Sequence, residues 1–260
     1  MNVVDKVLSR LRRARLDRLP ADEAWRRLAA RLGVLWLCYH SLSPDLDGYT
    51  YRTTAHAFDA HLSALKGVAD IVTATEAVAS LRAGTAAARD RLLCVISFDD
   101  GYRDNWTLAT PVLERHAVPA TLFVPRDLIR GGGDTFMTEG ELRELSRHSL
   151  WQVGAHGVTH SVLTGLLPAD QRREMIDCNT WLTDLLGMPP AGFAYPLGQA
   201  DEGTVGLAGE IYDHALRTDQ RLGNRFDPWQ IRRHCPTRAQ DDPGALARAL
   251  LSAPVENGLQ

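Results

Sequence analysis

Cysteine is scarce in this 260-residue sequence, and its placement argues against two common uses of the residue. The four cysteines lie far apart and form no C-x-x-C pair: Cys38, Cys94, Cys178 and Cys235. Two of them fall within apolar, strand-like runs, so we expect buried free thiols rather than disulfides or a zinc cluster. Such thiols are typical of a reducing compartment.

Long apolar runs are also missing. No stretch reaches the roughly eighteen apolar residues that a transmembrane helix requires, and the basic N-terminus is not followed by the apolar segment of a signal peptide. We therefore expect a cytoplasmic protein. Because 45% of the residues are hydrophobic, a chain of this length can bury a full core, and we expect one globular α/β domain.

Basic residues are concentrated at the N-terminus, where residues 1–33 carry nine of them against four acidic ones. The net charge of −3 therefore hides a segment of +5 and a remainder of −8. Helical spacing predicts that 1–33 is a basic, amphipathic extension, in one helix or in two separated at Pro20. It either packs on the body or docks on a partner or an anionic membrane surface, peripherally at the inner face. The acidic remainder argues against nucleic-acid binding.

From Val34 onward, short apolar runs alternate with helical patterns. Seven runs predict strands: Val34–Cys38, Asp70–Thr73, Leu92–Ser97, Ala120–Val124, Trp151–Ala155, Gly192–Tyr195 and His214–Thr218. Between them, helices are predicted at Phe58–Lys66, Asn105–His116, Thr138–Arg147 and Pro168–Leu186. The repeated alternation of strand and helix predicts a parallel sheet. In such a sheet the functional loops follow the carboxyl ends of the strands.

Two adjacent carboxylates, Asp99 and Asp100, follow one of these apolar runs. Their mutual repulsion and desolvation predict a cation beside them, and Gly101 lets the chain turn sharply there. His156 and His160 follow another run, four residues apart. If that segment forms a helical turn, both imidazoles face one ion, and a carboxylate completes a His₂-Asp set with positions open for water.

This combination predicts a metal-dependent hydrolase. A metal in such a site lowers the pKa of its bound water towards about 7 and polarises a carbonyl. The second carboxylate, which does not bind the metal, can accept the proton of that water. An isolated D-D-G is usually a turn, and an isolated H-x-x-x-H is usually a helix face, so the prediction depends on finding the two together after separate strands.

Over residues 34–260 the sequence resembles the polysaccharide deacetylases of carbohydrate esterase family 4, with the NodB-homology fold. Three motifs carry the resemblance: Ser97-Phe98-Asp99-Asp100-Gly101, His156-x-x-x-His160 and, as a variant, Phe193-Ala194-Tyr195-Pro196. It implies a catalytic domain folded as a distorted (β/α) barrel of about seven parallel strands. It also implies Asp99 as general base and the Tyr195 backbone N–H as oxyanion donor. The metal ligands that it implies are Asp100, His156 and His160. Two imidazoles favour Zn²⁺, and Co²⁺, Ni²⁺ or Mn²⁺ would also fit.

The sequence departs from this family in two places. The third motif usually carries an arginine that positions the base, and Phe193-Ala194-Tyr195 has none there. The late Leu-x-x-His motif, which supplies the general acid, is not evident. The pair Tyr39-His40 resembles the N-terminal signature of a subgroup that includes biofilm-polysaccharide N-deacetylases, and this implies His40 as the acid. Arg232 or Arg233 resembles the family's late arginine, and the sequence does not decide between them.

Five further residues are predicted to contact substrate: Tyr39, Tyr102, Pro196, Leu197 and Trp229. Trp229 follows Pro228 and could equally be a packing residue.

The predicted function is metal-dependent N-deacetylation of an amino sugar in a bacterial glycan or its precursor. The carbohydrate substrate would carry an N-acyl group. A deformylase acting on a lipid-linked or nucleotide-linked formamido sugar would use the same machinery. An alternative from another class is a non-catalytic glycan-binding protein on the same barrel, which the missing arginine and the missing late motif favour.

Overall fold

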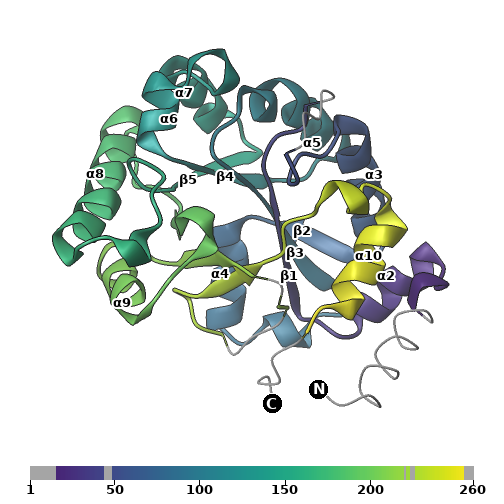
Figure 1. Ribbon diagram of the computed structural model, residues 1–260. Helices are drawn as coiled ribbons and strands as arrows, with labels where there is room; N and C mark the ends of the chain where they lie inside the picture. Colours follow the sequence, from purple (N-terminus) through teal and green to yellow (C-terminus); the bar gives the residue numbers. More distant parts are fainter. Residues whose placement is uncertain (1–15, 44–48, 220, 223–225, 255–260) are drawn as a thin grey trace.

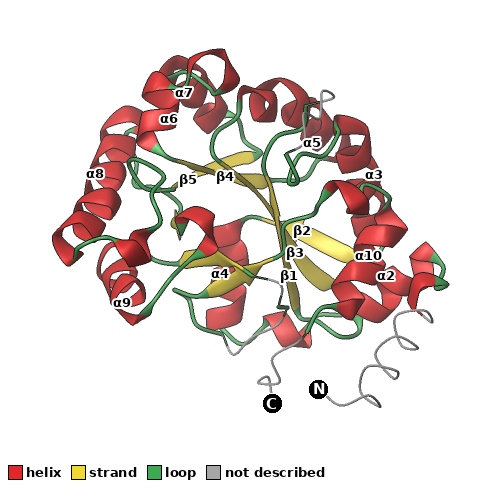
Figure 2. Ribbon diagram, in the orientation of Figure 1, coloured by secondary structure: helices red, strands yellow, loops and turns green. Residues whose placement is uncertain are grey.

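The protein folds as one sheet of eight parallel strands surrounded by helices (Figure 1 and Figure 2). The computed structural model describes residues 16–43, 49–219, 221–222 and 226–254. The strands pair in the order β1-β3-β4-β5-β6-β7-β8, and β2 joins the first half of β3. Their bounds are β1 Val34–Tyr39, β2 Ala69–Val72, β3 Leu92–Asp99, β4 Ala120–Val124, β5 Trp151–Ala155, β6 Phe193–Ala194, β7 Ala215–Thr218 and β8 Ile231–Arg233.

The ring of strands is nearly closed, because β8 returns to β1. Leu37 and His234 form a parallel bridge. The His234 N–H donates to the Trp36 carbonyl, and the Cys38 N–H donates to the His234 carbonyl, both at 2.9 Å. Seven strands therefore make a distorted barrel with helices outside it, as Figure 2 shows, and the predicted fold is confirmed.

All seven predicted strands coincide with β1 to β7, whereas the sequence pattern does not predict β8. That strand has three residues, Ile-Arg-Arg, and its two arginines hide the apolar signal. The helices are α2 Ala21–Ala29, α3 Ala55–Lys66, α4 Ala74–Arg82, α5 Thr110–His116, α6 Arg126–Gly131, α7 Glu139–Arg147, α8 Pro168–Leu186, α9 Glu202–Ile211 and α10 Pro243–Ser252. The helix predicted at 105–116 begins with a π-helical turn, Asn105–Ala109, before α5.

The described part of the N-terminal extension packs on the barrel. Trp25 and Leu28 of α2 are buried in the main core. The Arg31 guanidinium donates to the Leu251 carbonyl of α10 at 2.7 Å. Residues 1–15, which carry much of the predicted basic face, lie outside the described residues. No helix among the described residues is both long enough and apolar enough to cross a membrane.

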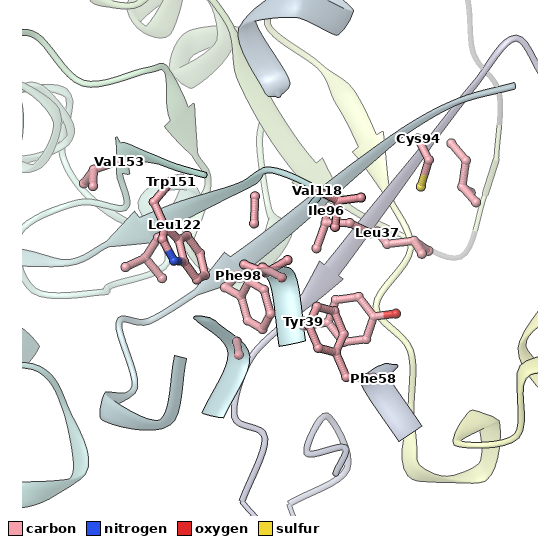
Figure 3. Packing of buried hydrophobic residues seen from close by; sticks show 14 of the residues in the cluster. Leu37, Tyr39, Phe58, Cys94, Ile96, Phe98, Val118, Leu122, Trp151 and Val153 are labelled. Atoms are coloured by element: carbon pink, nitrogen blue, oxygen red, sulfur yellow. The ribbon is translucent and has the colours of Figure 1, made fainter. Parts of the chain in front are cut away.

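Alternate residues of the strands face the inside and the outside of the barrel. The inward set forms one apolar cluster with residues of α4, and its strand members are Trp36, Val95, Phe123, Ala194, Leu216 and Ile231. The outward set packs under the helices, where Figure 3 shows Leu37, Tyr39, Ile96, Phe98 and Leu122. Residues of α4 form hydrogen bonds with inward-facing residues near the start of β4 and β5. This helix therefore covers the amino-terminal end of the barrel. The carboxyl-terminal end carries the polar residues.

Gly154 of β5 provides a test of the barrel interior. A Cβ at this position would lie 2.4 Å from ring atoms of Phe123, whose side chain is fully buried in the inward cluster. We expect Gly154→Ala to lower the free energy of unfolding by about 1–3 kcal/mol in urea denaturation. Gly206→Ala is the control, because nothing lies within 4 Å of a Cβ there and α9 should gain up to about 1 kcal/mol. Equal stability of the two variants would contradict this packing.

Candidate active site

The three predicted metal ligands converge at the carboxyl-terminal end of the barrel. Asp100 follows β3, and His156 and His160 follow β5, so neighbouring loops bring them together. Their ligand atoms lie within 4.8 Å of one another. The Asp100 Oδ1 is 3.1 Å from the His160 Nε2 and 3.6 Å from the His156 Nε2. Burial lowers the pKa of His160, but the Asp100 carboxylate outweighs this effect and raises that pKa overall.

The loop between the two histidines is not the helical turn that their spacing suggests. Gly157 and His160 both have positive φ, +83° and +62°, and the loop is irregular. Glu174 of α8 holds it: one carboxylate oxygen accepts the N–H groups of Val158 and Thr159 at 2.8 and 2.9 Å, and the other accepts the Thr159 hydroxyl. The sequence analysis misses Glu174, because a glutamate in the middle of a long helix carries no signal of this role.

The chemistry of these side chains fits a divalent cation. The His156 Nδ1 lies 2.7 Å from the Ala194 carbonyl oxygen and must carry the hydrogen, so the Nε2 presents a lone pair. Burial lowers the pKa of His156 to about 4, which keeps the ring neutral. The Asp100 Oδ1 is buried and accepts no well-aligned hydrogen bond among the described residues, although the His160 Nε2 lies 3.1 Å away. The His156 lone pair and this carboxylate oxygen lie 3.6 Å apart, an arrangement that a cation would satisfy.

Asp99 is paired with an arginine from another part of the chain, which takes the place of the arginine missing from the third motif. The Arg233 guanidinium of β8 donates to both carboxylate oxygens at 2.7 Å, and both side chains are buried. Burial raises the pKa of Asp99, but the charge and hydrogen bonds of Arg233 outweigh it and hold that pKa well below its usual value. Arg232 faces the other side of β8 and pairs with Asp219. The structure therefore distinguishes the two arginines that the sequence leaves open.

His40 follows β1, at the same carboxyl-terminal end of the barrel as Asp99 and Asp100. Its ring stacks on Tyr51, with the centroids 5.4 Å apart, and its carbonyl accepts the Asn105 side-chain amide at 2.7 Å. Burial lowers the pKa of His40, while the charges of Asp100 and Asp99 act in the opposite direction. His40 is therefore within electrostatic reach of both carboxylates.

The predicted role of the Tyr195 N–H is wrong. This N–H donates to the Leu216 carbonyl of β7 at 2.9 Å, so the sheet already uses it. The Tyr195 hydroxyl donates to the Trp229 carbonyl. Pro196 has no N–H, and Leu197, in the tight turn that follows, has φ +54° and an N–H with no acceptor among the described residues.

Two of the predicted substrate contacts are also wrong. Tyr39 points outward from β1, where it packs between Phe58 and Phe98, and its hydroxyl lies 3.1 Å from the His61 Nδ1. The Trp229 indole N–H donates to a carbonyl at the end of α9, and its ring packs against that helix. Both residues belong to the packing under the helices.

The other three predicted contacts remain at the carboxyl-terminal end. Tyr102 stacks on Phe136, with the centroids 4.9 Å apart, and burial, followed by the charge of Asp100, raises its pKa to about 12. Pro196 is buried against the histidine loop, where a Cβ on Gly157 would be 3.5 Å from it. The Leu197 side chain is 62% exposed.

The buried ion pair yields a stability prediction. Arg233→Met leaves the Asp99 carboxylate buried without its cationic partner, so we expect a loss of about 3–5 kcal/mol in the free energy of unfolding. Adding Asp99→Asn should restore much of that loss in chemical denaturation. Arg232→Met is the control, with a smaller effect. If the double variant is no more stable than Arg233→Met, the pair does not control stability in this way.

Comparisons with known proteins agree with these motifs and this fold. The family model described as polysaccharide deacetylase matches residues 87–211, which include Asp99, Asp100 and both histidines. The “Putative polysaccharide deacetylase YxkH” of Bacillus subtilis (strain 168) is 30% identical over 203 residues, which cover 78% of this chain and 70% of that protein.

Two solved structures share the fold. The deacetylase PplD of Streptococcus pyogenes, solved in complex with acetate, has a TM-score of 0.74 at 21% identity, covering 84% of this chain and 97% of that one. IcaB from Ammonifex degensii has a TM-score of 0.69 at 22% identity, with the same coverage. By its motifs, its barrel and its identity to YxkH, this chain belongs to the polysaccharide deacetylase family.

Proposed function

We propose that this protein is a metal-dependent N-deacetylase that hydrolyses the acetamide of an amino sugar in a bacterial glycan or its precursor. One observation carries the proposal: a buried carboxylate, held ionised by a bidentate arginine, lies beside a convergent Asp-His-His set. The Asp99 Oδ2 is 3.8 Å from the His156 Nε2, so the proposed base lies directly beside the proposed metal ligands. Family membership supports the same reaction.

Asp100, His156 and His160 would hold the metal. A divalent cation bound there would polarise the amide carbonyl and activate a water molecule. Two imidazoles and one carboxylate favour Zn²⁺, and Co²⁺, Ni²⁺ or Mn²⁺ would also fit.

Asp99 accepts the proton of the attacking water. Its lowered pKa keeps it ionised, and the two hydrogen bonds from Arg233 fix the orientation of the carboxylate. Because Arg233 supplies what the third motif lacks, one of the two reasons for preferring a non-catalytic protein is removed.

His40 donates a proton to the departing amine, as the Tyr-His subgroup resemblance implies. The Leu197 N–H replaces the Tyr195 N–H as the oxyanion donor, since it is the first N–H after β6 that lacks an acceptor among the described residues. The products are acetate and a free amino sugar. Tyr102, Pro196 and Leu197 would contact the sugar.

The basic N-terminal extension bears on whether the substrate is a glycan polymer or a smaller precursor. A cytoplasmic, lipid-linked precursor would suit peripheral contact of residues 1–33 with an anionic membrane surface. Within this segment, α2 is committed to packing on α10, so such contact would depend on the residues before it.

The metal set can be tested by removing its members. We expect Asp100→Ala and His156→Ala each to lose about one equivalent of bound zinc relative to the wild type, measured by elemental analysis, together with hydrolysis. His148→Ala is the matched control, because His148 lies before β5 at the opposite end of the barrel and contacts Glu114. Full metal content and activity in Asp100→Ala would contradict the proposal.

The reaction can be tested by its product. We expect the zinc-loaded protein to release acetate from N-acetylated amino-sugar precursors, and Asp99→Asn to keep the metal while the rate falls about 10²–10⁴-fold. Release of formate from N-formyl sugars, without acetate from N-acetyl sugars, would instead indicate the deformylase. Failure of a metal-loaded protein to cleave any acylated amino sugar would favour the glycan-binding alternative.

A further inference from the structure

Two of the four cysteines meet where the barrel closes. Cys38 lies on β1, and Cys235 comes two residues after Arg233 of β8. The parallel bridge between Leu37 and His234 places the next residues, Cys38 and Cys235, beside each other in register. Both side chains are buried, and both face inward, since Arg233 does so and the alternation has a period of two.

His40 completes a cluster with these two thiols. It follows Cys38 by two residues and so faces the same side of the strand. A ring nitrogen of His40 and the two Sγ atoms all lie within 4.8 Å of one another. The His40 Nδ1 is buried and has no hydrogen-bond partner among the described residues.

Two sulfurs and an imidazole are a different donor set from the one at Asp100. Thiolates select soft or borderline cations such as Zn²⁺ and Cu⁺, and three such ligands leave a fourth tetrahedral position open. We propose that Cys38, His40 and Cys235 form a second metal site, which binds one thiophilic cation next to the Asp99–Arg233 pair. The sequence does not predict it, because 197 positions separate the two cysteines.

Binding at this site needs no oxidant. Each thiol loses its S–H proton to solvent, and the two thiolates together balance the charge of a dication. Burial raises the pKa of the Cys38 thiol well above its usual value, so the thiol is protonated in the absence of a metal. In that state the Cys38 Sγ donates to the Asp99 Oδ2 at 3.3 Å.

Occupancy would change the groups that we assign to hydrolysis. A cation on this site holds His40 and removes the Cys38 donor from Asp99, so a thiophilic cation in excess should inhibit the enzyme. This consequence rests on the proposed function, whereas the binding itself does not.

Cobalt titration of the reduced protein tests the binding. Cobalt bonded to thiolate gives an intense near-ultraviolet charge-transfer band, which the Asp100 site cannot produce because it contains no sulfur. We expect about two cobalt ions per chain in the wild type, with this band, and about one ion without the band in Cys235→Ser and in Cys38→Ser. Cys94→Ser is the matched control, because Cys94 is also a buried strand cysteine outside the cluster, and it should keep the band.

Absence of the band in the folded wild type would overturn the second site, and so would a band that survives in both Cys235→Ser and Cys38→Ser. His156→Ala separates this result from the proposed function, since that variant should lose hydrolysis and keep the band. A wild-type protein that releases acetate but shows no thiolate band would contradict only the second site. One that shows the band but cleaves no substrate would contradict only the proposed function.

Discussion

The ion pair between Arg233 and Asp99 is the interaction on which both the fold and the site depend. Neither charge could remain inside the barrel alone, because burying an unpaired guanidinium or carboxylate costs several kcal/mol. Together they join β8 to β3 across the barrel interior and form two hydrogen bonds of 2.7 Å. The same contacts keep the carboxylate ionised and fixed in orientation, as its proposed role of general base requires.

The backbone separates the roles of the two adjacent aspartates. Asp99 is the last residue of β3, and the alternation of the strand directs it inward to Arg233. Asp100 has φ +73°, a left-handed conformation that turns the chain, and its side chain meets His156 and His160. Repulsion between the two carboxylates is therefore offset by different partners, an arginine for Asp99 and two histidines for Asp100.

The sequence predicts the features that depend on local pattern. Apolar runs locate β1 to β7, and a site at strand ends follows because parallel strands share one carboxyl-terminal face. Both faces of these strands are buried, so apolar content does not reveal which way a residue points. The inward direction of Arg233 and the outward direction of Tyr39 therefore come from the structure. The Tyr195 N–H is occupied because a neighbouring strand, distant in sequence, accepts it.

The central claim is that Arg233 keeps the Asp99 carboxylate ionised inside the barrel. Carbon-13 NMR of protein labelled in its aspartate carboxyl groups measures this directly, with the Asp99 resonance assigned by its absence from Asp99→Asn. We predict that this resonance does not titrate between pH 7 and about 4, a range over which an ordinary aspartate, with a pKa of about 3.9, becomes nearly half protonated. A titration midpoint at or above about pH 4 would contradict the account.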